Sequence, residues 1–313
     1  MDLVVGAGGF VGRHVAAALQ GRTDVRLLAA EKPSEPELEA ALDGIEVVYF
    51  AAETWAPWSR LYFRREPHPV IVRTLKVARR AGVRRLVHLS TADVFGPDQN
   101  LRLTESSPLK PVHAYERLKL REEQWLRESA GELELVILRP ARLFGTHDDF
   151  LTPTLLRELQ AGRLWLVAGG RVQQTFVAGP DLGRAFVAAG ERGQAGATYL
   201  VGGFDSSWRD FLEACGQALQ TPARVIGIPY DVAYVLAGVR EWLTPYRARS
   251  WPGLFGVDLF GRPRLYDDSR SRRRLTWSPQ VGSFDQVAGE LAAFYGRRRA
   301  SERQPTATSP PGR

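Results

Sequence analysis

The sequence of 313 residues predicts an α/β protein, with a doubly wound parallel sheet in its first half and a smaller α+β domain after it. Short apolar runs alternate with segments of helical periodicity up to Gly145, and the first of these runs leads directly into a glycine-rich turn. Beyond Gly145, helical pieces alternate with short strands and with loops rich in glycine and proline. We therefore expect a first domain over residues 1–145, to which the segment 172–190 returns, and a second domain over residues 146–295.

Each element of the first domain follows from its local pattern. The helix expected at Val70–Ala81 carries Arg79 and Arg80 in its last turn and Gly82 just after it, which is typical of a helix C-terminus. The periodic segments predict further helices at Gly12–Leu19, Pro36–Leu42 and Ala114–Ala130. The apolar runs predict strands at Leu3–Val5, Val25–Ala29, Val47–Ala51, Leu86–Ser90 and Leu135–Arg139.

The second domain is less regular. Periodicity predicts helices at Pro153–Gly162, Asp181–Gly190, Trp208–Leu219 and Phe284–Tyr295. Residues 296–313 are polar and contain several prolines, so we expect them to form a disordered tail.

The composition argues against several classes of function. Cys215 is the only cysteine, so neither an intrachain disulfide nor a CxxC zinc or redox site is possible. The net charge of +7 arises from 42 lysines and arginines, and all but four of these are arginines spread along the whole chain. The dense basic runs have no aromatic residues interleaved, so we expect solvated surfaces and no nucleic-acid site.

The pattern of apolar and titratable residues narrows the classes further. The most apolar helical stretch, Val232–Leu243, is interrupted by Arg240 and Glu241, so no membrane span is expected. The N-terminal residues carry no basic leader or cleavage site, from which we expect a cytoplasmic protein. The five histidines have no metal-ligand spacing, and no serine lies in a nucleophile elbow, so we expect neither a metal site nor a hydrolase.

The first motif that carries chemistry is the turn Gly6-Ala7-Gly8-Gly9-Phe10-Val11-Gly12, between an apolar strand and a helix. Gly6 allows a tight turn, Gly9 allows the backbone to approach a pyrophosphate, and Gly12 allows close packing of helix and strand. The helix N-terminus adds unpaired N–H groups for the phosphates. This predicts a Rossmann-type dinucleotide site with Gly6, Gly9, Phe10, Val11 and Gly12, to which Ala51 at the end of its strand would contribute.

The second motif is Tyr115-Glu116-Arg117-Leu118-Lys119. A spacing of four residues puts Tyr115 and Lys119 on one face of a helix. A nearby ammonium lowers the pKa of a phenol toward the working pH of a proton-transfer catalyst. Nearly all basic residues of this chain are arginines, so a lysine at position 119 indicates that a compact ammonium is needed there, one that can also hydrogen-bond a ribose.

The third motif is Ser90-Thr91, which ends an apolar strand and precedes Val94-Phe95-Gly96. In a doubly wound sheet, ligands bind beyond the carboxyl ends of the strands. The hydroxyls therefore face the same crevice as the glycine turn, where one of them can hold a substrate oxygen while Tyr115 moves its proton.

Together these motifs resemble the extended short-chain dehydrogenase/reductase family, of the epimerase/dehydratase type. The resemblance covers about residues 1–295. Its further matches are Leu138-Arg139-Pro140, Phe144-Gly145, Phe176-Val177 before Asp181-Leu182, and Leu275-Thr276-Trp277-Ser278-Pro279.

The resemblance implies an NAD(P)-dependent oxidoreductase or epimerase that transfers hydride at a secondary alcohol or ketone. In it, Tyr115 is the acid/base, Thr91 is the catalytic hydroxyl with Ser90 beside it, and Lys119 binds the nicotinamide ribose and tunes the tyrosine. It also implies a homodimer through the helices at 70–81 and 114–130. The alternative is a non-catalytic, nucleotide-sensing or partner-binding protein on the same fold.

Departures from the family restrict the substrate, which is either sterol-like or sugar-derived. Sugar-nucleotide 4,6-dehydratases carry an Asp-Glu pair after the hydroxyl, but this chain has Ala92-Asp93, which disfavours dehydration. Binders of nucleoside-diphosphate sugars usually have an asparagine near the position of Arg142, whereas the segment 262–269 resembles the hydroxysteroid-dehydrogenase-like branch. Arg142, Phe150, Arg171 and Arg264 are the candidate substrate residues.

The largest departure lies between residues 13 and 36. This segment has room for one strand, where the family has two strands and a helix between them. Glu31 follows that strand and would bind either the adenine side of the cofactor or the ribose 2′-hydroxyl, which would favour NAD. Arg13 would instead meet the 2′-phosphate of NADP, so the choice between NAD and NADP stays open.

Overall fold

A computed structural model describes residues 1–30, 32–52, 67–97, 102–162, 164–243 and 253–303 of the chain. Its centre is a six-stranded sheet in the order β2-β1-β3-β4-β5-β9, in which every neighbouring pair is parallel. The strands are β1 Asp2–Val5, β2 Val25–Leu28, β3 Val47–Phe50, β4 Arg85–Leu89, β5 Glu134–Pro140 and β9 Thr198–Val201.

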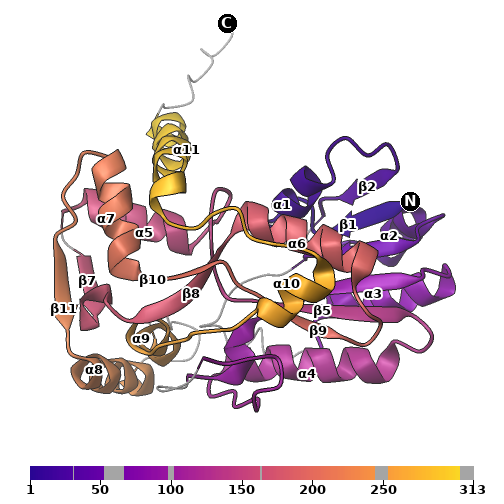
Figure 1. Cartoon of the computed structure of the whole chain (residues 1–313), viewed down its shortest axis with the longest axis horizontal. Coiled ribbons are helices and arrows are strands. Elements are labelled where there is room, and N and C mark those ends of the chain that lie inside the picture. Colours follow the sequence, from indigo (N-terminus) through magenta and orange to yellow (C-terminus); the bar gives the residue numbers. More distant parts are fainter. Residues whose placement is uncertain (31, 53–66, 98–101, 163, 244–252, 304–313) are drawn as a thin grey trace, which may run out of the picture.

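Helices cover both faces of this sheet, because alternate strand residues point to opposite sides. Val4 of β1 faces a core with α1 (Phe10–Ala18), α6 (Gly179–Arg192) and α10 (Ser269–Leu275). Leu3 and Val5 face a second core with α2 (Glu35–Leu42), α3 (Pro69–Arg80) and α4 (Ala114–Ser129). Figure 1 shows α6 beside α1, with α3 and α4 lower in the view. This is the predicted doubly wound, Rossmann-type architecture.

A smaller α+β lobe packs against the C-terminal side of the sheet (Figure 1). Its core is rich in aromatic rings, among them Phe144, Phe176, Phe211 and Phe284, whose neighbouring centroids lie 4.9–6.3 Å apart. Its strands form the sheets β10-β8-β6 and β11-β7, over β6 Arg142–Phe144, β7 Leu164–Val167, β8 Gln173–Ala178, β10 Phe204–Ser207 and β11 Val225–Ile228. Its helices are α5 Leu151–Gln160, α7 Trp208–Ala218, α8 Tyr230–Leu243, α9 Leu254–Gly261 and α11 Asp285–Arg303, and short 3₁₀ turns lie at η2 Ala92–Phe95 and η3 Ala168–Gly170.

The structure differs from the expected division of the chain in three places. Strand β9 comes from the range 146–295 but is the sixth strand of the first sheet, because its run Thr-Tyr-Leu-Val is buried against β5. In the segment 172–190, α6 packs on α1 over the first sheet, whereas β8 pairs within the second lobe. Helix α11 continues to Arg303, so a disordered tail from residue 296 was wrong as far as residue 303. Arginine, alanine and glutamate sustain the helix there, and the next proline is Pro305.

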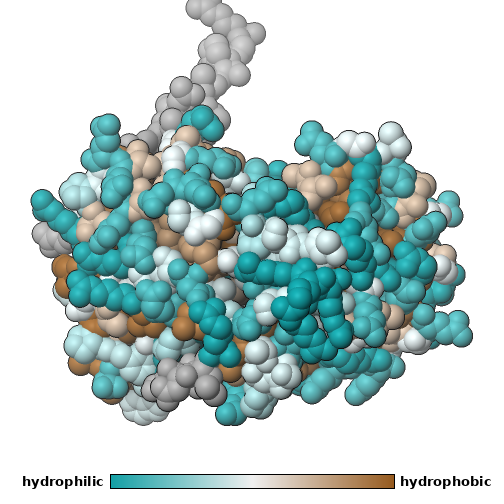
Figure 2. Space-filling view, in the orientation of Figure 1, coloured by the Kyte–Doolittle hydropathy of each residue, from teal (hydrophilic) through white to brown (hydrophobic). Residues whose placement is uncertain are grey.

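Two surface features bear on later arguments. Between α1 and α2 the described chain holds one strand, β2, which is an edge strand of the six-stranded sheet. Helix α8 turns an apolar stripe outward, with Val235 63% and Trp242 81% exposed. Apolar residues also reach the surface over β11 and β7, at the lower left of Figure 2. No helix in the described ranges is long and apolar enough to cross a membrane.

Candidate active site

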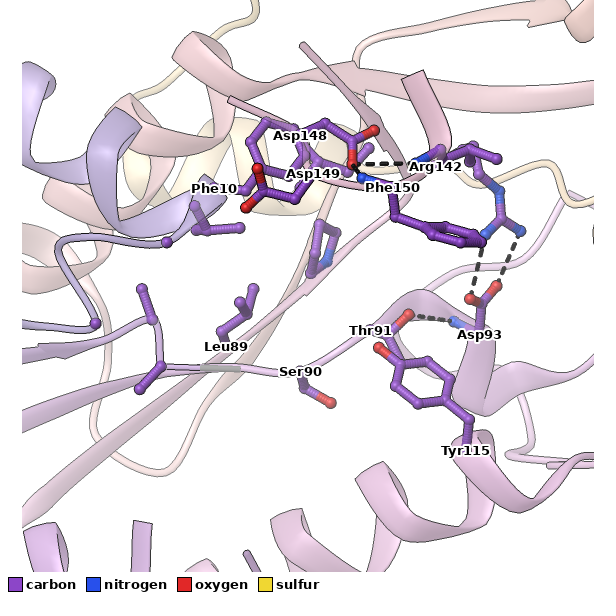
Figure 3. Close-up of a pocket in the computed structure, with 18 of the residues that line it drawn as sticks. Phe10, Leu89, Ser90, Thr91, Asp93, Tyr115, Arg142, Asp148, Asp149 and Phe150 are labelled. Carbon is purple, nitrogen blue, oxygen red and sulfur yellow. Dashed lines mark hydrogen bonds and ion pairs between the residues drawn. The ribbon is translucent and has the colours of Figure 1, made fainter. Parts of the chain in front are cut away.

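A cavity of about 360 Å³ opens where β1, β3, β4 and β5 reach their carboxyl ends, the edge at which a doubly wound sheet binds ligands. Its floor is the sheet and its far wall is the start of α5 in the second lobe (Figure 3). The predicted site residues that line it are Gly6, Gly9, Phe10, Val11, Ala51, Ser90, Thr91, Tyr115, Arg142 and Phe150.

The glycine turn has the geometry of a dinucleotide cradle. Gly6 has a φ of +83°, and a Cβ there would lie 2.5 Å from the Cα of Ala52. A Cβ on Gly12 would lie 1.9 Å from the carbonyl oxygen of Gly6, so helix α1 can only reach the turn with glycine at both positions. Gly9 is the N-cap of α1 and has no side chain to cap the helix. The first N–H groups of α1 can therefore bind a pyrophosphate.

The two predicted catalytic hydroxyls lie side by side at one end of the cavity. Thr91 is the N-cap of η2, and its Oγ1 accepts the N–H of Asp93 at 3.1 Å. Tyr115 is in the first turn of α4 and 5% exposed, and its ring packs edge-on against Phe255 with centroids 5.8 Å apart. Figure 3 shows the Tyr115 hydroxyl directed toward the Thr91 hydroxyl.

Lys119 lies one turn further along α4 and is 4% exposed. Its Nζ donates to the carbonyl oxygen of Leu89 at 3.0 Å, which holds the ammonium at the end of β4. It also contacts Oε1 of Glu122 at 3.1 Å. The position is on the helix face of Tyr115, as the spacing of four residues predicts.

Ser90 has a different environment from Thr91. Its hydroxyl donates to Glu123, which also forms a buried ion pair with Arg139. Burial acts to raise the pKa of Glu123, but Arg139 and Ser90 outweigh it and hold the pKa below its usual range. The hydroxyl of Ser90 is therefore engaged beneath the cavity floor, and Thr91 is the better placed of the two to meet a substrate.

Four buried charges form a network under the substrate end of the cavity. Arg142 donates to both oxygens of Asp93, at 3.1 and 3.3 Å, and Arg264 donates to Asp93 at 3.0 Å and to Glu116 at 2.9 Å. Burial acts to raise the pKa of Asp93, but the two arginines outweigh it, so the pKa is lowered. Asp93 therefore stays a carboxylate, and the two cations and two anions balance.

The remaining residues that the sequence suggested for substrate or cofactor binding do not line the cavity or lie outside the described residues. Arg264 is 2% exposed and lies in the network below the cavity, whereas Arg171 is exposed just after η3 and does not line the cavity. Arg13 is exposed, and its Nε donates to the carbonyl oxygen of Gly8. Glu31 lies outside the described residues.

Several lining residues did not follow from motifs, among them Ala29, Ala52, His68, Asp93, Pro140, Ala141, Asp148 and Asp149. Ala29, Pro140 and Ala141 stand at strand ends, which is a signal that could have found them. Asp148 accepts the N–H groups of Phe150, Leu151 and Thr152 and so caps α5, although burial raises its pKa. Within the described residues there is no cluster of three His, Cys, Asp or Glu side chains placed for a metal ion.

Comparison with known proteins gives a matching family and relatives that cover most of the chain. Residues 3–202 match the model of the NAD dependent epimerase/dehydratase family. The chain is 28% identical over 307 residues to the 4-hydroxy-2-methyl-3-oxo-4-farnesyl-3,4-dihydroquinoline-1-oxide ketoreductase of Stigmatella aurantiaca, covering 89% of this chain and 92% of that one. It is 27% identical to sterol demethylase protein B of Methylococcus capsulatus, covering 88% and 93%.

Solved structures share the fold. RMD from Pseudomonas aeruginosa, complexed with NADPH, has a TM-score of 0.72 at 19% identity and covers 95% of this chain and 99% of its own. The dTDP-glucose 4,6-dehydratase DesIV from Streptomyces venezuelae, with NAD and TYD bound, has a TM-score of 0.74 at 21% identity and covers 96% and 98%.

Proposed function

Since the chain belongs to the NAD-dependent epimerase/dehydratase family and is an NAD(P)-dependent enzyme of the oxidoreductase or epimerase type, we propose that it reduces a bulky, apolar ketone, with Tyr115 as the proton donor. The observation that carries the proposal is the convergence of the Thr91 and Tyr115 hydroxyls in a cavity that continues to the glycine turn. The reverse reaction, oxidation of the secondary alcohol, uses the same groups.

The residues present fit a dinucleotide. The N–H groups at Phe10 and Val11 would hold its pyrophosphate, because the N–H of Gly9 is donated to the carbonyl oxygen of Gly6 at 3.0 Å. The ends of β1 and β3 with Ala51 would contact its ribose. Lys119 is not among the residues that line the cavity, but it is held at the end of β4, from where it would hydrogen-bond the ribose beside the nicotinamide. When bound, the nicotinamide supplies or accepts the hydride.

The chain's own groups handle the proton. Thr91 donates a hydrogen bond to the carbonyl oxygen of the substrate and orients it, and Tyr115 then donates its hydroxyl proton to the same oxygen. The charge of Lys119, one turn away on α4, would stabilise the tyrosinate that remains. Phe255 packs against the tyrosine ring and fixes its direction.

The described lining supports an apolar substrate without phosphate groups. Arg142 is its one arginine, and its charge is balanced by Asp93, so it does not offer an uncompensated site for a diphosphate. Leu143, Phe150 and Leu151 provide apolar surface beside the two hydroxyls. A farnesylated quinoline ketone and a sterol, which appear in the names of two relatives, are substrates of this kind.

The network also supports reduction over dehydration. Elimination of a hydroxyl would need a proton donor after Thr91, where Ala92 has no proton to give and Asp93 is held as a carboxylate by Arg142 and Arg264. We therefore expect no 4-keto-6-deoxy product from sugar nucleotides.

The test is the Tyr115→Phe variant, assayed by the absorbance of NADH and NADPH against a panel of cyclic and branched ketones. Loss of a positioned proton donor should lower kcat by roughly 10²–10⁴-fold while cofactor binding stays unchanged. Activity of Y115F within a few-fold of wild type would refute the role of the tyrosine. If no ketone in the panel is reduced by wild type, the proposed substrate class is wrong.

We also propose a homodimer through α3 and α4. A surface groove between these helices is lined by Val72, Leu75 and Trp125, with Lys76, Arg79 and Arg80 at its rim. Light scattering of wild type and of a Trp125→Glu variant tests this: a dimer should dissociate in the variant, and a monomeric wild type would exclude the proposal.

A further inference from the structure

A further buried carboxylate, that of Glu122, contacts the proposed catalytic lysine. Glu122 is 4% exposed, and its Oε1 is 3.1 Å from Nζ of Lys119, one helical turn earlier on α4. The same oxygen lies 3.2 Å from Nε2 of His88, which is fully buried on β4 and stacks on Phe50 with ring centroids 5.7 Å apart. The backbone N–H of His68 donates to the other oxygen of Glu122 at 3.5 Å.

This carboxylate is ionised. Burial acts to raise the pKa of Glu122, but the charge of Lys119 and the nearby imidazole of His88 outweigh it, and the pKa lies well below its usual range. The ammonium of Lys119 therefore contacts a full negative charge as well as the carbonyl oxygen of Leu89.

The neighbouring carboxylates on α4 pair with arginines and not with Lys119. Glu123, the next residue, pairs with Arg139 and Arg127 and binds the hydroxyl of Ser90. Glu116 pairs with Arg264. Of the acidic side chains described on α4, Glu122 is thus the one that forms an ion pair with Lys119.

We propose that Glu122 is a positioning residue that acts through Lys119: it holds the ammonium at the end of β4 and offsets part of the lysine's effect on Tyr115. The inference rests on the proposed function, because it requires that Tyr115 transfers the proton. An unbalanced buried ammonium would favour the tyrosinate and leave less protonated tyrosine for ketone reduction near neutral pH. With the carboxylate in place, Lys119 keeps its geometry toward the ribose while Tyr115 stays a competent acid.

The test is the pH dependence of kcat/KM for ketone reduction in Glu122→Gln, which keeps the shape and removes the charge. Reduction needs protonated Tyr115, so the rate falls as the pH rises through the tyrosine pKa. Tyr115 and Glu122 are seven residues apart on one helix, about 10 Å along its axis. At an effective dielectric constant of about 20–40, removal of the charge should move the alkaline limb to lower pH by about 0.6–1.2 units.

The controls separate charge from structure. Glu128→Gln removes a charge from the exposed face of the same helix and should leave the limb where it is. Glu122→Asp keeps the charge and should also keep the limb, even if kcat falls. If Glu122→Gln does not fold, Glu122→Met is apolar and of similar size and should give the same downward shift.

Failure of this inference and failure of the proposed function give different results. An alkaline limb that does not move, or moves to higher pH, in Glu122→Gln or Glu122→Met would overturn this inference, provided that Tyr115→Phe is inactive. An active Tyr115→Phe enzyme would instead overturn the proposed function on which the inference rests.

Discussion

Substitution of Gly12 by alanine should damage both the fold and cofactor binding, because helix α1 touches the glycine turn at this residue. The added Cβ would lie 1.9 Å from the carbonyl oxygen of Gly6, 2.6 Å from its carbonyl carbon and 2.8 Å from the Cα of Ala7. All three atoms belong to the backbone, so no side chain can move aside. Restoring an ordinary contact of 3.4 Å requires the start of α1 and the turn to separate by about 1.5 Å.

The cost follows from this displacement. Overpacking of a close contact costs about 1–3 kcal/mol of unfolding free energy. The shift also misaligns the N–H groups at the N-terminus of α1, and loss of one hydrogen bond to a charged phosphate costs about 1.5–3 kcal/mol. We therefore expect NADH or NADPH to bind about 10–150-fold more weakly to Gly12→Ala than to wild type.

Fluorescence titration of the reduced cofactor and chemical denaturation measure the two effects. The matched control is Gly289→Ala in α11, where an added Cβ meets no atom within 4 Å. That variant should bind the cofactor normally and gain about 0.5–1 kcal/mol, because alanine favours a helix over glycine. Wild-type affinity and stability in Gly12→Ala would refute the reasoning.

Two further predictions concern the buried polar groups. Asp93→Asn should lower the unfolding free energy by about 3–5 kcal/mol in urea denaturation, because Arg142 and Arg264 lose the charge that compensates them. The pKa of Asp93 is lowered in the folded state, so its contribution to stability is present above the unfolded pKa and is lost as the pH falls through the folded pKa. The difference in unfolding free energy between wild type and Asp93→Asn should therefore shrink in acid. An equal difference at all pH values would contradict this. Thr91→Val should lower kcat with little change in unfolding free energy. Ser90→Ala should lower the unfolding free energy by about 1–3 kcal/mol, because Glu123 loses one hydrogen-bond partner, and should have a smaller effect on kcat. The reverse pattern would show that Ser90 and not Thr91 meets the substrate.

The local features of the site could be read from the sequence, because each depends on residues close together in the chain. The turn Gly6–Gly12 needs only a strand, three glycines and a helix start, and the structure has these at β1 and α1. Tyr115 and Lys119 share a face because one helix contains both, and Ser90 and Thr91 stand where β4 ends. The doubly wound sheet followed from the alternation of apolar runs and periodic segments, since parallel strands need helical crossovers.

Tertiary structure decided the features that join distant segments. Asp93, Glu116, Arg142 and Arg264 form one network although up to 171 residues separate its members, and no spacing in the sequence encodes such a meeting. The same holds for β9, whose four-residue apolar run fits an edge of either sheet until the chain folds. The residue types at positions 90 and 91 do not separate the two hydroxyls, and only the family resemblance favoured Thr91. The contact with Glu123 engages the hydroxyl of Ser90 and leaves that of Thr91 at the cavity. Burial and ion pairing depend on which elements pack together, so the charge state of a carboxylate such as Glu122 is a property of the folded chain alone.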